Sequence, residues 1–410
     1  MSNFQQRLEK YADLAVKVGV NIQEGQTLII NASLESAELV RILARKAYET
    51  GAKHVHLEWF DDHVNRTKYE LAPDEAFQEY PEWKARGLEE MAEAGAAVIS
   101  IVSSDPDLLK GINPKRIAAA SKAAGMALEK YRNYMQSDKI SWCVLSAASR
   151  AWAQKVFPEA AEDEAVEKLW DAIFGAVRVD KEDPVAAWAE HNSALHSKVD
   201  YLNSKHYKAL HYTAEGTDLT IELADKHLWV GAGSVNEKGH EFMANMPTEE
   251  VFTAPNKDGI TGYVTSKKPL SYGGNLIDNF TFTFESGRIV DVKAEQGEEI
   301  LKQLVETDEG SHYIGEVALV PHDSPISNSG VLFYNTLFDE NASNHLALGN
   351  AYPFCIEGGK KMTGEELKKN GLNTSITHVD FMIGSADMNI DGIKEDGTRE
   401  PLFKNGNWAF

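Results

Sequence analysis

"QTLIINASLESAELVRILARKAYETGAKHVHLEW", residues 26–59, contains the pattern that indicates the fold class of the first half of this chain. Residues 26–33 and 53–59 are strand-like, and the stretch between them has helical periodicity that stops at Gly51. A strand, a helix and a second strand in this order indicate two parallel strands covered by a helix.

The same alternation continues to about residue 145. "AAVISIVSS" (96–104) and "ISWCVL" (140–145) are further strand candidates. Asn113-Pro114 marks the start of another helix, because proline is favoured at the first helical position. Residues 148–200 have a helical pattern. The repeated order predicts a mostly parallel sheet covered by helices.

The pattern changes near residue 205. "TDLTIELADKHLWVGA" (217–232) and "NFTFTFESGRIVDVKAE" (279–295) alternate with period two, and Ser286-Gly287 is a hairpin turn candidate. A chain of 410 residues is too long for one typical core, so two domains are expected. We predict an α/β N-terminal domain over 1–200 with a mostly parallel sheet. An α+β C-terminal domain with mainly antiparallel strands is expected over 201–410.

Charge and composition limit the classes of partner. The formal net charge of −22 argues against nucleic acid or an anionic membrane as a partner, because both would be repelled. No apolar run approaches the roughly 18 residues of a membrane span. The N-terminus has no signal-peptide pattern and is expected to form an amphipathic helix. Two distant cysteines, Cys143 and Cys355, cannot form a disulfide framework. We therefore expect a cytoplasmic protein.

Several common catalytic motifs are absent from the sequence. In "GHEFMAN" (239–245), Ala244 stands where the second histidine of an HExxH zinc motif would be. There is no Walker A loop and no GxSxG. "GAGSVNEKG" (231–239) has a misplaced third glycine for a dinucleotide fingerprint and is interpreted as a turn.

"THVDFMIG" (377–384) carries the first sign of a site. His378 and Asp380 are two residues apart in an apolar strand, so their side chains point to the same face. A lone histidine in a strand is commonly structural. A carboxylate in an apolar strand is costly to bury without a partner, so it usually pairs or binds a metal.

Other stretches of the second half offer similar groups. In "MPTEEVFTAP" (246–255), Glu249 and Glu250 are expected to face opposite ways, so at most one points inward. "IGEVALV" (314–320) begins an apolar strand with Glu316. The stretch "NTLFDENASNHLALGNAYPF" (335–354) carries Asp339, Glu340, His345 and Tyr352. Oxygen and nitrogen ligands of this kind suit Zn²⁺, Co²⁺ or Mn²⁺, and a two-metal site needs at least one bridging carboxylate.

"PTEEVFTAP", "IGEVALV", "NASNHLALGNAYP" and "THVDFMIG" together resemble the M29 metallo-aminopeptidases, the aminopeptidase T group. The resemblance covers the whole chain and implies a homodimer that removes N-terminal residues from peptides with a free N-terminus. It also implies two divalent ions per chain, Zn, Co, Mn or Mg, in the C-terminal domain. The ligands implied for this sequence are Glu250, Glu316, His345, His378 and Asp380, with Tyr352 at or beside the metals.

The catalytic roles are hypotheses built on that resemblance. Amide hydrolysis needs a general base, and Glu340 is our candidate, with Asp339 as its competitor. Tyr352 is expected to ligate a metal or to donate a hydrogen bond to the tetrahedral intermediate. The role expected for the N-terminal domain is to shape or gate access to the metal site. His54 and His56, in one N-terminal strand, are interpreted as ordinary surface residues.

Three alternatives stay open at this point. A dinuclear metal phosphoesterase uses similar ligands but usually needs Arg or Lys near the metals. The candidate stretches carry almost none, with Lys360 and Lys361 the nearest. A non-catalytic, metal-stabilised peptide-binding protein would also carry such ligands. The third is a globular protein whose acids pair with scattered basic residues.

Overall fold

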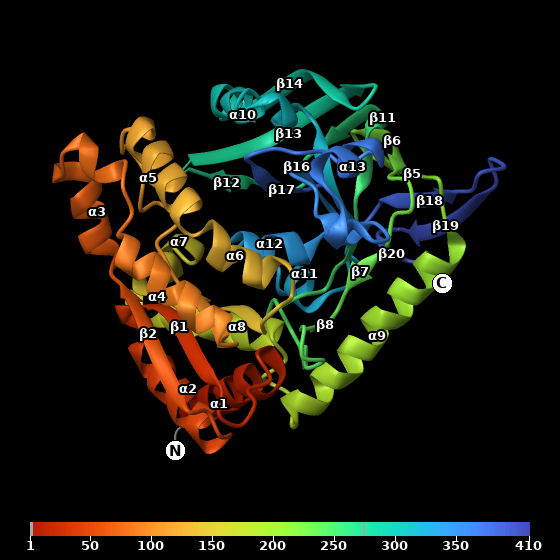
Figure 1. The fold of residues 1–410 in the computed structure, drawn as a ribbon. Helices are drawn as coiled ribbons and strands as arrows, with labels where there is room; N and C mark the ends of the chain where they lie inside the picture. Colours follow the sequence, from red (N-terminus) through yellow and green to blue (C-terminus); the bar gives the residue numbers. More distant parts are fainter. Residues whose placement is uncertain (1–2, 274) are drawn as a thin grey trace. The chain divides into compact units, whose positions relative to one another are not determined.

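The structure is a computed structural model that describes residues 3–273 and 275–410. Its described residues form two compact units (Figure 1). The first unit extends to Glu190 and includes Gly233–Pro247, and the second comprises His191–Ala232 and Thr248–Phe410. The boundary predicted near residue 200 falls inside α9 (Pro184–Lys205).

A four-stranded parallel sheet forms the centre of the first unit. Its strand order is β2 (His54–Phe60), β1 (Thr27–Ser33), β3 (Ala97–Val102) and β4 (Trp142–Ser146). Each neighbouring pair in this order runs parallel. The prediction of an α/β domain with a mostly parallel sheet is confirmed.

Helices with apolar stripes cover this sheet. Between β1 and β2, α2 (Ala37–Glu49) buries Leu39 and Leu43, as the helical periodicity predicted. On one face of the sheet, α4 (Glu82–Glu93) and α6 (Glu129–Gln136) share a core cluster with Ile29 of β1. The remaining α-helices are α1 (Asn3–Leu14), α3 (Asp62–Leu71), α5 (Pro114–Ala127), α7 (Arg150–Val156) and α8 (Glu162–Ala176).

Two local predictions in this unit are confirmed. The N-terminal α1 is amphipathic and buries Leu8, Tyr11 and Leu14. Asn113 caps α5 by accepting a hydrogen bond from the Lys115 amide, and Pro114 takes the first helical position. The short strands β8 (Ser234–Val235) and β9 (Glu241–Phe242) pair with each other in the segment that packs with this unit.

The second unit contains two antiparallel sheets. The smaller has the order β17 (His378–Met382), β16 (His345–Gly349), β15 (Ile314–Leu319), β10 (Val251–Thr253) and β7 (Val230–Gly231). All of its strand pairs are antiparallel. This arrangement confirms the predicted antiparallel character of the C-terminal half.

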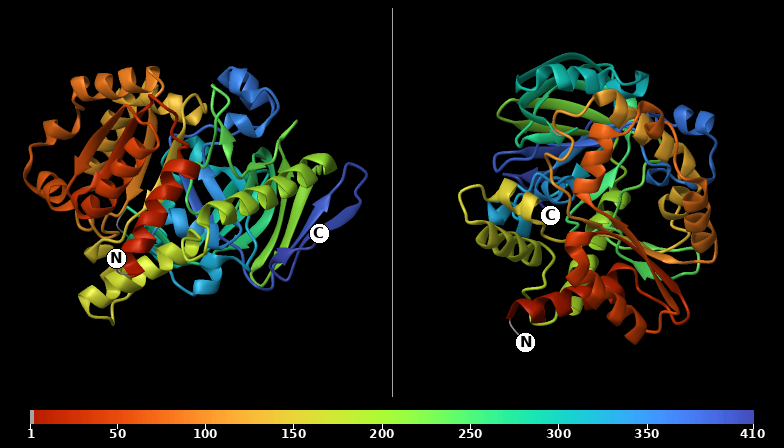
Figure 2. Two further views of the ribbon diagram at one scale, coloured as in Figure 1. Left: turned by 90° about the horizontal axis from the view of Figure 1, so that it is seen from below. Right: turned by 90° about the vertical axis from the view of Figure 1, so that its left-hand side faces the viewer.

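In the described residues the larger sheet has nine strands, and its C-terminal strands extend it beyond β5 (Ala209–Ala214) (Figure 2). Within it, Glu285 pairs with Arg288 across Ser286 and Gly287, whose φ angles are 48° and 80°. Two successive positive φ values are typical of a type I′ hairpin turn, as predicted. The strands in spatial order are β12 (Leu270–Tyr272), β13 (Asn275–Glu285), β11 (Pro255–Thr265), β6 (Thr217–Leu223), β5 (Ala209–Ala214), β18 (Asn389–Ile393), β19 (Arg399–Lys404) and β20 (Asn407–Trp408), and β14 (Arg288–Gln296) pairs with β13.

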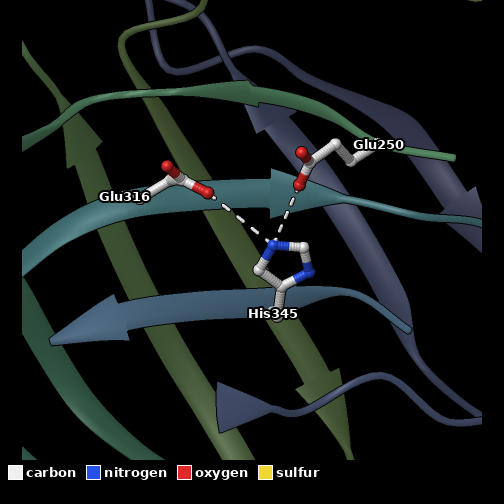
Figure 3. A group of neighbouring side chains, drawn as sticks. All are labelled: Glu250, Glu316 and His345. Carbon is white, nitrogen blue, oxygen red and sulfur yellow. Dashed lines mark ion pairs between the residues drawn. The ribbon is translucent and has the colours of Figure 1, made fainter. Parts of the chain in front are cut away.

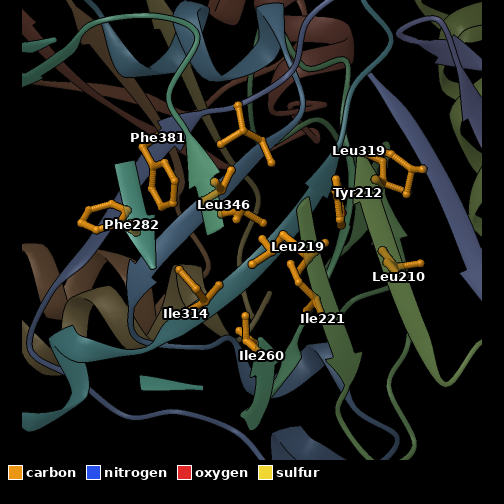
Figure 4. Packing of buried hydrophobic residues seen from close by; sticks show 14 of the residues in the cluster. Leu210, Tyr212, Leu219, Ile221, Ile260, Phe282, Ile314, Leu319, Leu346 and Phe381 are labelled. Carbon is orange, nitrogen blue, oxygen red and sulfur yellow. The ribbon is translucent and has the colours of Figure 1, made fainter. Parts of the chain in front are cut away.

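The two sheets share one hydrophobic core (Figure 4). Leu219 and Phe282 enter it from the larger sheet, and Leu346 and Phe381 enter it from the smaller one. Helices α9 and α10 (Glu298–Val305) add further apolar side chains to this core. One face of the smaller sheet therefore packs against the larger sheet in this core, and polar side chains can project only from the opposite face.

The short helices of the second unit lie in the segments around the smaller sheet. They are α11 (Pro325–Ser329), α12 (Thr336–Asp339) and α13 (Gly364–Lys369). Among the helices of the described ranges, none is both long enough and apolar enough to cross a bilayer.

Candidate metal centre

The register of the smaller sheet brings acids and imidazoles onto its polar face. Ala347 of β16 pairs with Glu316 of β15 on one side and with Asp380 of β17 on the other. Residues directly opposite in an antiparallel pair share a face, and so do residues two apart in a strand. Glu316, Asp380, His345 and His378 therefore all project from the face that does not enter the core.

A β-bulge in β15 makes this possible. Ile314 pairs with Leu348, which faces the core, whereas Glu316 pairs with Ala347, so Gly315 is the extra residue. In a regular strand Ile314 and Glu316 would share one face, and the bulge places them on opposite faces. A Cβ at Gly315 would overlap the carbonyl oxygens of Gly349 and Asn350, so only glycine permits this close approach.

The first group of side chains centres on His345, which is 1% exposed. Its Nε2 lies 3.0 Å from Glu250 Oε2 and 3.6 Å from Glu316 Oε1. Figure 3 shows both carboxylates directed at the same imidazole nitrogen. Glu250 comes from the loop before β10, and its potential ligand atom lies within 4.8 Å of those of Glu316 and His345.

The second group consists of Glu316, His378 and Asp380. His378 Nε2 lies 3.9 Å from Glu316 Oε2 and 3.6 Å from Asp380 Oδ1. The potential ligand atoms of this group also lie within 4.8 Å of one another. Glu316 belongs to both groups, with one carboxylate oxygen directed at each imidazole. A shared carboxylate of this kind is what a pair of metal ions requires as a bridge.

Backbone carbonyls orient both imidazoles. His378 Nδ1 lies 2.8 Å from the Asn350 carbonyl oxygen, and His345 Nδ1 lies 3.1 Å from the Ser343 carbonyl oxygen. A carbonyl only accepts, so each Nδ1 is the protonated donor. In the neutral imidazole Nε2 then carries the lone pair, as metal-binding histidines require.

The pKa values reflect a buried excess of negative charge. Burial raises the pKa of Glu316, and the Asp380 and Glu250 carboxylates add to the rise. Burial opposes protonation of His378, yet the Asp380 and Glu316 carboxylates outweigh it and raise the pKa of His378 to about 10. The pKa of His345 is also raised, against the effect of burial, by hydrogen bonds to the carboxylates beside it. The directions of these shifts follow from an excess of buried carboxylates over basic groups.

The residues of this centre fit divalent cations. In the described part of the chain, the ion pairs of Glu250, Glu316 and Asp380 are with imidazoles and not with Lys or Arg. Asp380 Oδ1 is buried and makes no hydrogen bond to a described residue. Three buried carboxylates face only two imidazoles here, and such an excess of negative charge is costly unless a cation balances it. Carboxylate and imidazole donors without thiolate suit Zn²⁺, Co²⁺ or Mn²⁺.

Glu340 and Tyr352 lie close to these groups. Burial raises the pKa of Glu340 well above its ordinary value, and the Asp380 and Glu250 carboxylates add to the effect. The Tyr352 ring lies 4.9 Å from the His378 ring, centroid to centroid. Burial and the Glu316 carboxylate raise the pKa of Tyr352, so its hydroxyl stays protonated in the absence of metal.

Asp339, the predicted competitor of Glu340, is engaged elsewhere. Its carboxylate accepts hydrogen bonds from the Phe333 amide at 2.9 Å and from the Asn335 amide at 3.0 Å. Burial raises the pKa of Asp339 to about 6. Both oxygens of Asp339 therefore hold the backbone of residues 333–335.

One expectation about the glutamate pair is wrong. Glu249 and Glu250 are both buried, at 5% and 7% exposure, although at most one was expected to point inward. They precede β10 instead of lying in it, so strict alternation does not apply to them. Glu249 Oε2 lies 3.6 Å from His191 Nε2 of α9, a pairing that had no signal in the sequence.

The strand pair His54 and His56 lies in the first unit. His56 pairs with Glu58 at 2.8 Å, and His54 is exposed. Among the described residues, neither belongs to a group of side chains that could hold a metal ion.

Comparison with known proteins agrees with this geometry. The family model for thermophilic metalloproteases, M29, matches residues 4–408. Aminopeptidase AmpS of Bacillus subtilis is 68% identical over 410 residues, covering 100% of both chains. Aminopeptidase 2 of Geobacillus stearothermophilus is 56% identical, covering 100% of this chain and 99% of the other.

A solved structure supports the same assignment at the level of the fold. The wild-type AmpT structure from Thermus thermophilus superposes with a TM-score of 0.94 at 43% sequence identity. The match covers 99% of this chain and 100% of the other. The fold and the family expected from the four sequence motifs are thus confirmed. The chain belongs to the M29 family of thermophilic metalloproteases, and it is a hydrolase of the metallo-aminopeptidase class.

Proposed function

We propose that the chain removes N-terminal residues from peptides with the help of two divalent ions. Glu250, Glu316 and His345 would hold one ion, and Glu316, His378 and Asp380 the other. The observation that carries this proposal is the position of Glu316, whose two carboxylate oxygens are directed at different imidazoles. Zn²⁺, Co²⁺, Mn²⁺ and Mg²⁺ are the candidate ions, and the donor set favours the first three.

When bound, the ions would supply a water nucleophile with its pKa lowered to about 7 and would polarise the scissile carbonyl. The protein must then move the proton. Glu340 is the proposed base: it accepts a proton from the attacking water and delivers it to the leaving amine. Burial and neighbouring carboxylates raise the pKa of Glu340, which makes it a stronger base than an ordinary glutamate.

Tyr352 is proposed to act on the developing oxyanion. Its ring packs beside His378, and its phenol stays a hydrogen-bond donor because its pKa is raised. A donor aimed at charge that forms in the transition state lowers the barrier more than one aimed at the substrate. Ligation of a metal by the same phenol is the other role open to Tyr352.

The excess of acids accounts for the preference for a free N-terminus. Glu250, Glu316 and Asp380 pair with only two imidazoles among the described residues. A peptide α-amine is cationic or becomes a metal ligand, and such a site attracts it in either form. The acidic centre therefore suits an exopeptidase acting on peptides.

Two properties of the whole protein are proposed more briefly. A cytoplasmic location fits the two buried, unbridged cysteines Cys143 and Cys355, since thiols persist in a reducing compartment. A homodimer is proposed on the resemblance to the family. Shaping or gating of access by residues 1–200 stays a prediction.

The alternatives have less support. A phosphoesterase would need Arg or Lys beside the ions to hold phosphate, and the carboxylates of the centre pair with imidazoles instead. A non-catalytic peptide binder would have no need for a second acid such as Glu340 beside the ligands. Membership of a metalloprotease family also favours hydrolysis.

Turnover with and without metal tests the proposal. Chelation should abolish hydrolysis of leucine, arginine or methionine chromogenic amides, and Co²⁺ or Zn²⁺ should restore it. The matched substrate control is the N-acetylated amide, which should resist cleavage. Glu340→Gln should retain both ions and lose about 10²–10⁴-fold in kcat. Equal cleavage of the acetylated amide would contradict the exopeptidase assignment, and full activity of Glu340→Gln would contradict the assigned base.

A further inference from the structure

Asn341 is a fully buried amide directly after the proposed base, with 0% exposure. Its Oδ1 accepts a hydrogen bond from the Glu249 amide at 2.7 Å. Its Nδ2 donates to the Leu337 carbonyl at 2.9 Å and to Glu340 Oε1 at 3.4 Å. The polar groups of this side chain are thus engaged on both sides.

These partners determine the orientation of the amide. If the amide were flipped, Nδ2 would face the Glu249 N–H, and Oδ1 would face the Leu337 carbonyl and the Glu340 carboxylate. Donor would then oppose donor and acceptor would oppose acceptor. A buried polar group without partners is costly, so the flipped state is excluded.

The same contacts join three parts of the site. Glu249 immediately precedes Glu250, which lies 3.0 Å from His345. Leu337 belongs to α12, and Glu340 follows that helix directly. One side chain therefore couples the loop that carries Glu250 to the segment that carries Glu340.

We propose that Asn341 is a positioning residue that holds the Glu340 carboxylate in register with the loop carrying Glu250. The inference rests on the proposed function, because it assigns Asn341 a role through the proposed base. Among the described residues, Asn341 is the side chain that hydrogen-bonds the Glu340 carboxylate. Its contact with Glu340 leaves Oε2 available for proton transfer.

A neutral amide suits this role better than a cation. Lys or Arg at this place would pair with Glu340 and lower the pKa of the carboxylate, which would weaken it as a base. An amide N–H restrains the orientation of the carboxylate without neutralising it. The hydrogen bond at 3.4 Å is long, as catalytic contacts commonly are in the absence of substrate.

The test compares Asn341→Ala and Asn341→Asp with the native enzyme, each loaded with Zn²⁺ or Co²⁺. The aspartate keeps the acceptor for the Glu249 amide, but its second oxygen faces the Leu337 carbonyl and Glu340 Oε1, so it repels the Glu340 carboxylate instead of holding it and should lower kcat at least as much as the alanine does. Both variants should retain two ions per chain and show a kcat lowered by about 10–100-fold, because small misplacement of a catalytic group costs this much. KM should change less than about threefold, since ground-state binding is unaffected.

Asn203→Ala is the matched control. Asn203 also makes two side-chain hydrogen bonds to backbone, to the amide and the carbonyl of Trp229, at 2.8 and 2.9 Å. Among the described residues, its side-chain hydrogen bonds do not involve Glu340. This variant should have native kcat and native metal content. That result would show that the loss of two side-chain hydrogen bonds to backbone does not by itself lower kcat.

The decisive comparison adds Asn341→Ala to Glu340→Gln. If Asn341 acts through the Glu340 carboxylate, the second substitution should lower the residual kcat less than about twofold, since coupled residues are not additive. An equal fold loss in both backgrounds would overturn the inference, and so would native kcat in both Asn341 variants. Loss of metal from both Asn341 variants would also overturn it, because Asn341 would then stabilise the loop that carries Glu250 and would not act through Glu340.

The outcomes separate this inference from the proposed function. If Glu340→Gln is inactive and both Asn341 variants have native kcat, only the inference fails. If Glu340→Gln keeps native kcat, the assigned base fails and the role of Asn341 fails with it.

Discussion

Glu316 is the residue on which the proposed metal pair depends, because its carboxylate belongs to both groups of potential ligands. Ala347 lies between Glu316 and Asp380 in the sheet register. The sequence motif around each acid is enough to suggest it as a metal ligand. That Glu316 belongs to both ligand groups follows only from the register of three strands.

Removal of single ligands should distinguish the two groups. Asp380→Ala affects one group, so its metal content should fall from about two ions per chain toward one. Glu316→Ala affects both groups, so its metal content should fall toward zero. Glu249→Gln, which changes a buried acid outside both groups, is the control and should keep both ions. Metal analysis after dialysis measures these contents. Equal losses in the Asp380 and Glu316 variants would argue against a shared carboxylate.

Asp339 gives a prediction about stability and pH. Burial raises the pKa of Asp339 from 3.8 to about 6, so the folded state binds this proton more tightly than the unfolded state. The stabilisation is fully present below pH 3.8 and is lost as the pH rises through 6. Relative to Asp339→Asn, the native protein should therefore lose roughly 2–3 kcal/mol of unfolding free energy across this window. Urea titrations of both proteins at several pH values measure the difference, and a constant difference would contradict it.

At the scale of elements, the bulge in β15 decides which face Glu316 joins. Strand alternation alone assigns Ile314 and Glu316 to the same face, and their observed pairing partners lie on opposite faces. The elements themselves were predictable, because period-two and helical patterns are local. The bulge was not, because it depends on close approach between Gly315 and the backbone of Gly349 and Asn350.

Gly315→Ala tests the importance of the bulge. The added Cβ would displace the Asn350 carbonyl, which accepts the hydrogen bond from His378 Nδ1, so metal affinity should fall by about 10–100-fold. Gly364→Ala is the control, since a Cβ there meets nothing within 4 Å. Calorimetric titration with Zn²⁺ measures both affinities. Native affinity in Gly315→Ala would show that the bulge tolerates a side chain.

At the scale of the whole molecule, the two fold classes were predictable and the way the chain divides between the units was not. Residues 233–247 belong to the first compact unit although they lie beyond the predicted boundary. Such a return depends on packing between distant segments, and no local pattern encodes it. The burial of Glu249 beside His191 was missed for the same reason.

Metal removal should change the thermal stability of the protein. Ions that bind only the folded state stabilise it by about 2.7 kcal/mol when their concentration is 100 times Kd. The excess of buried carboxylates in the second unit makes the metal-free state the less stable one. Calorimetric scans should therefore show a lower Tm after chelation and recovery on addition of Zn²⁺ or Co²⁺. Glu316→Ala should be insensitive to chelation, and a chelator effect of native size in that variant would point to ions bound elsewhere.

The most direct measurement for the central claim is anomalous diffraction from crystals of this protein grown with Zn²⁺ or Co²⁺. A bridging Glu316 should give two metal peaks about 3.5–4 Å apart, each about 2.0–2.2 Å from a different oxygen of Glu316. It also predicts that His345 binds one ion and His378 the other. A single peak, or two peaks that Glu316 does not bridge, would rule out the proposed two-metal centre.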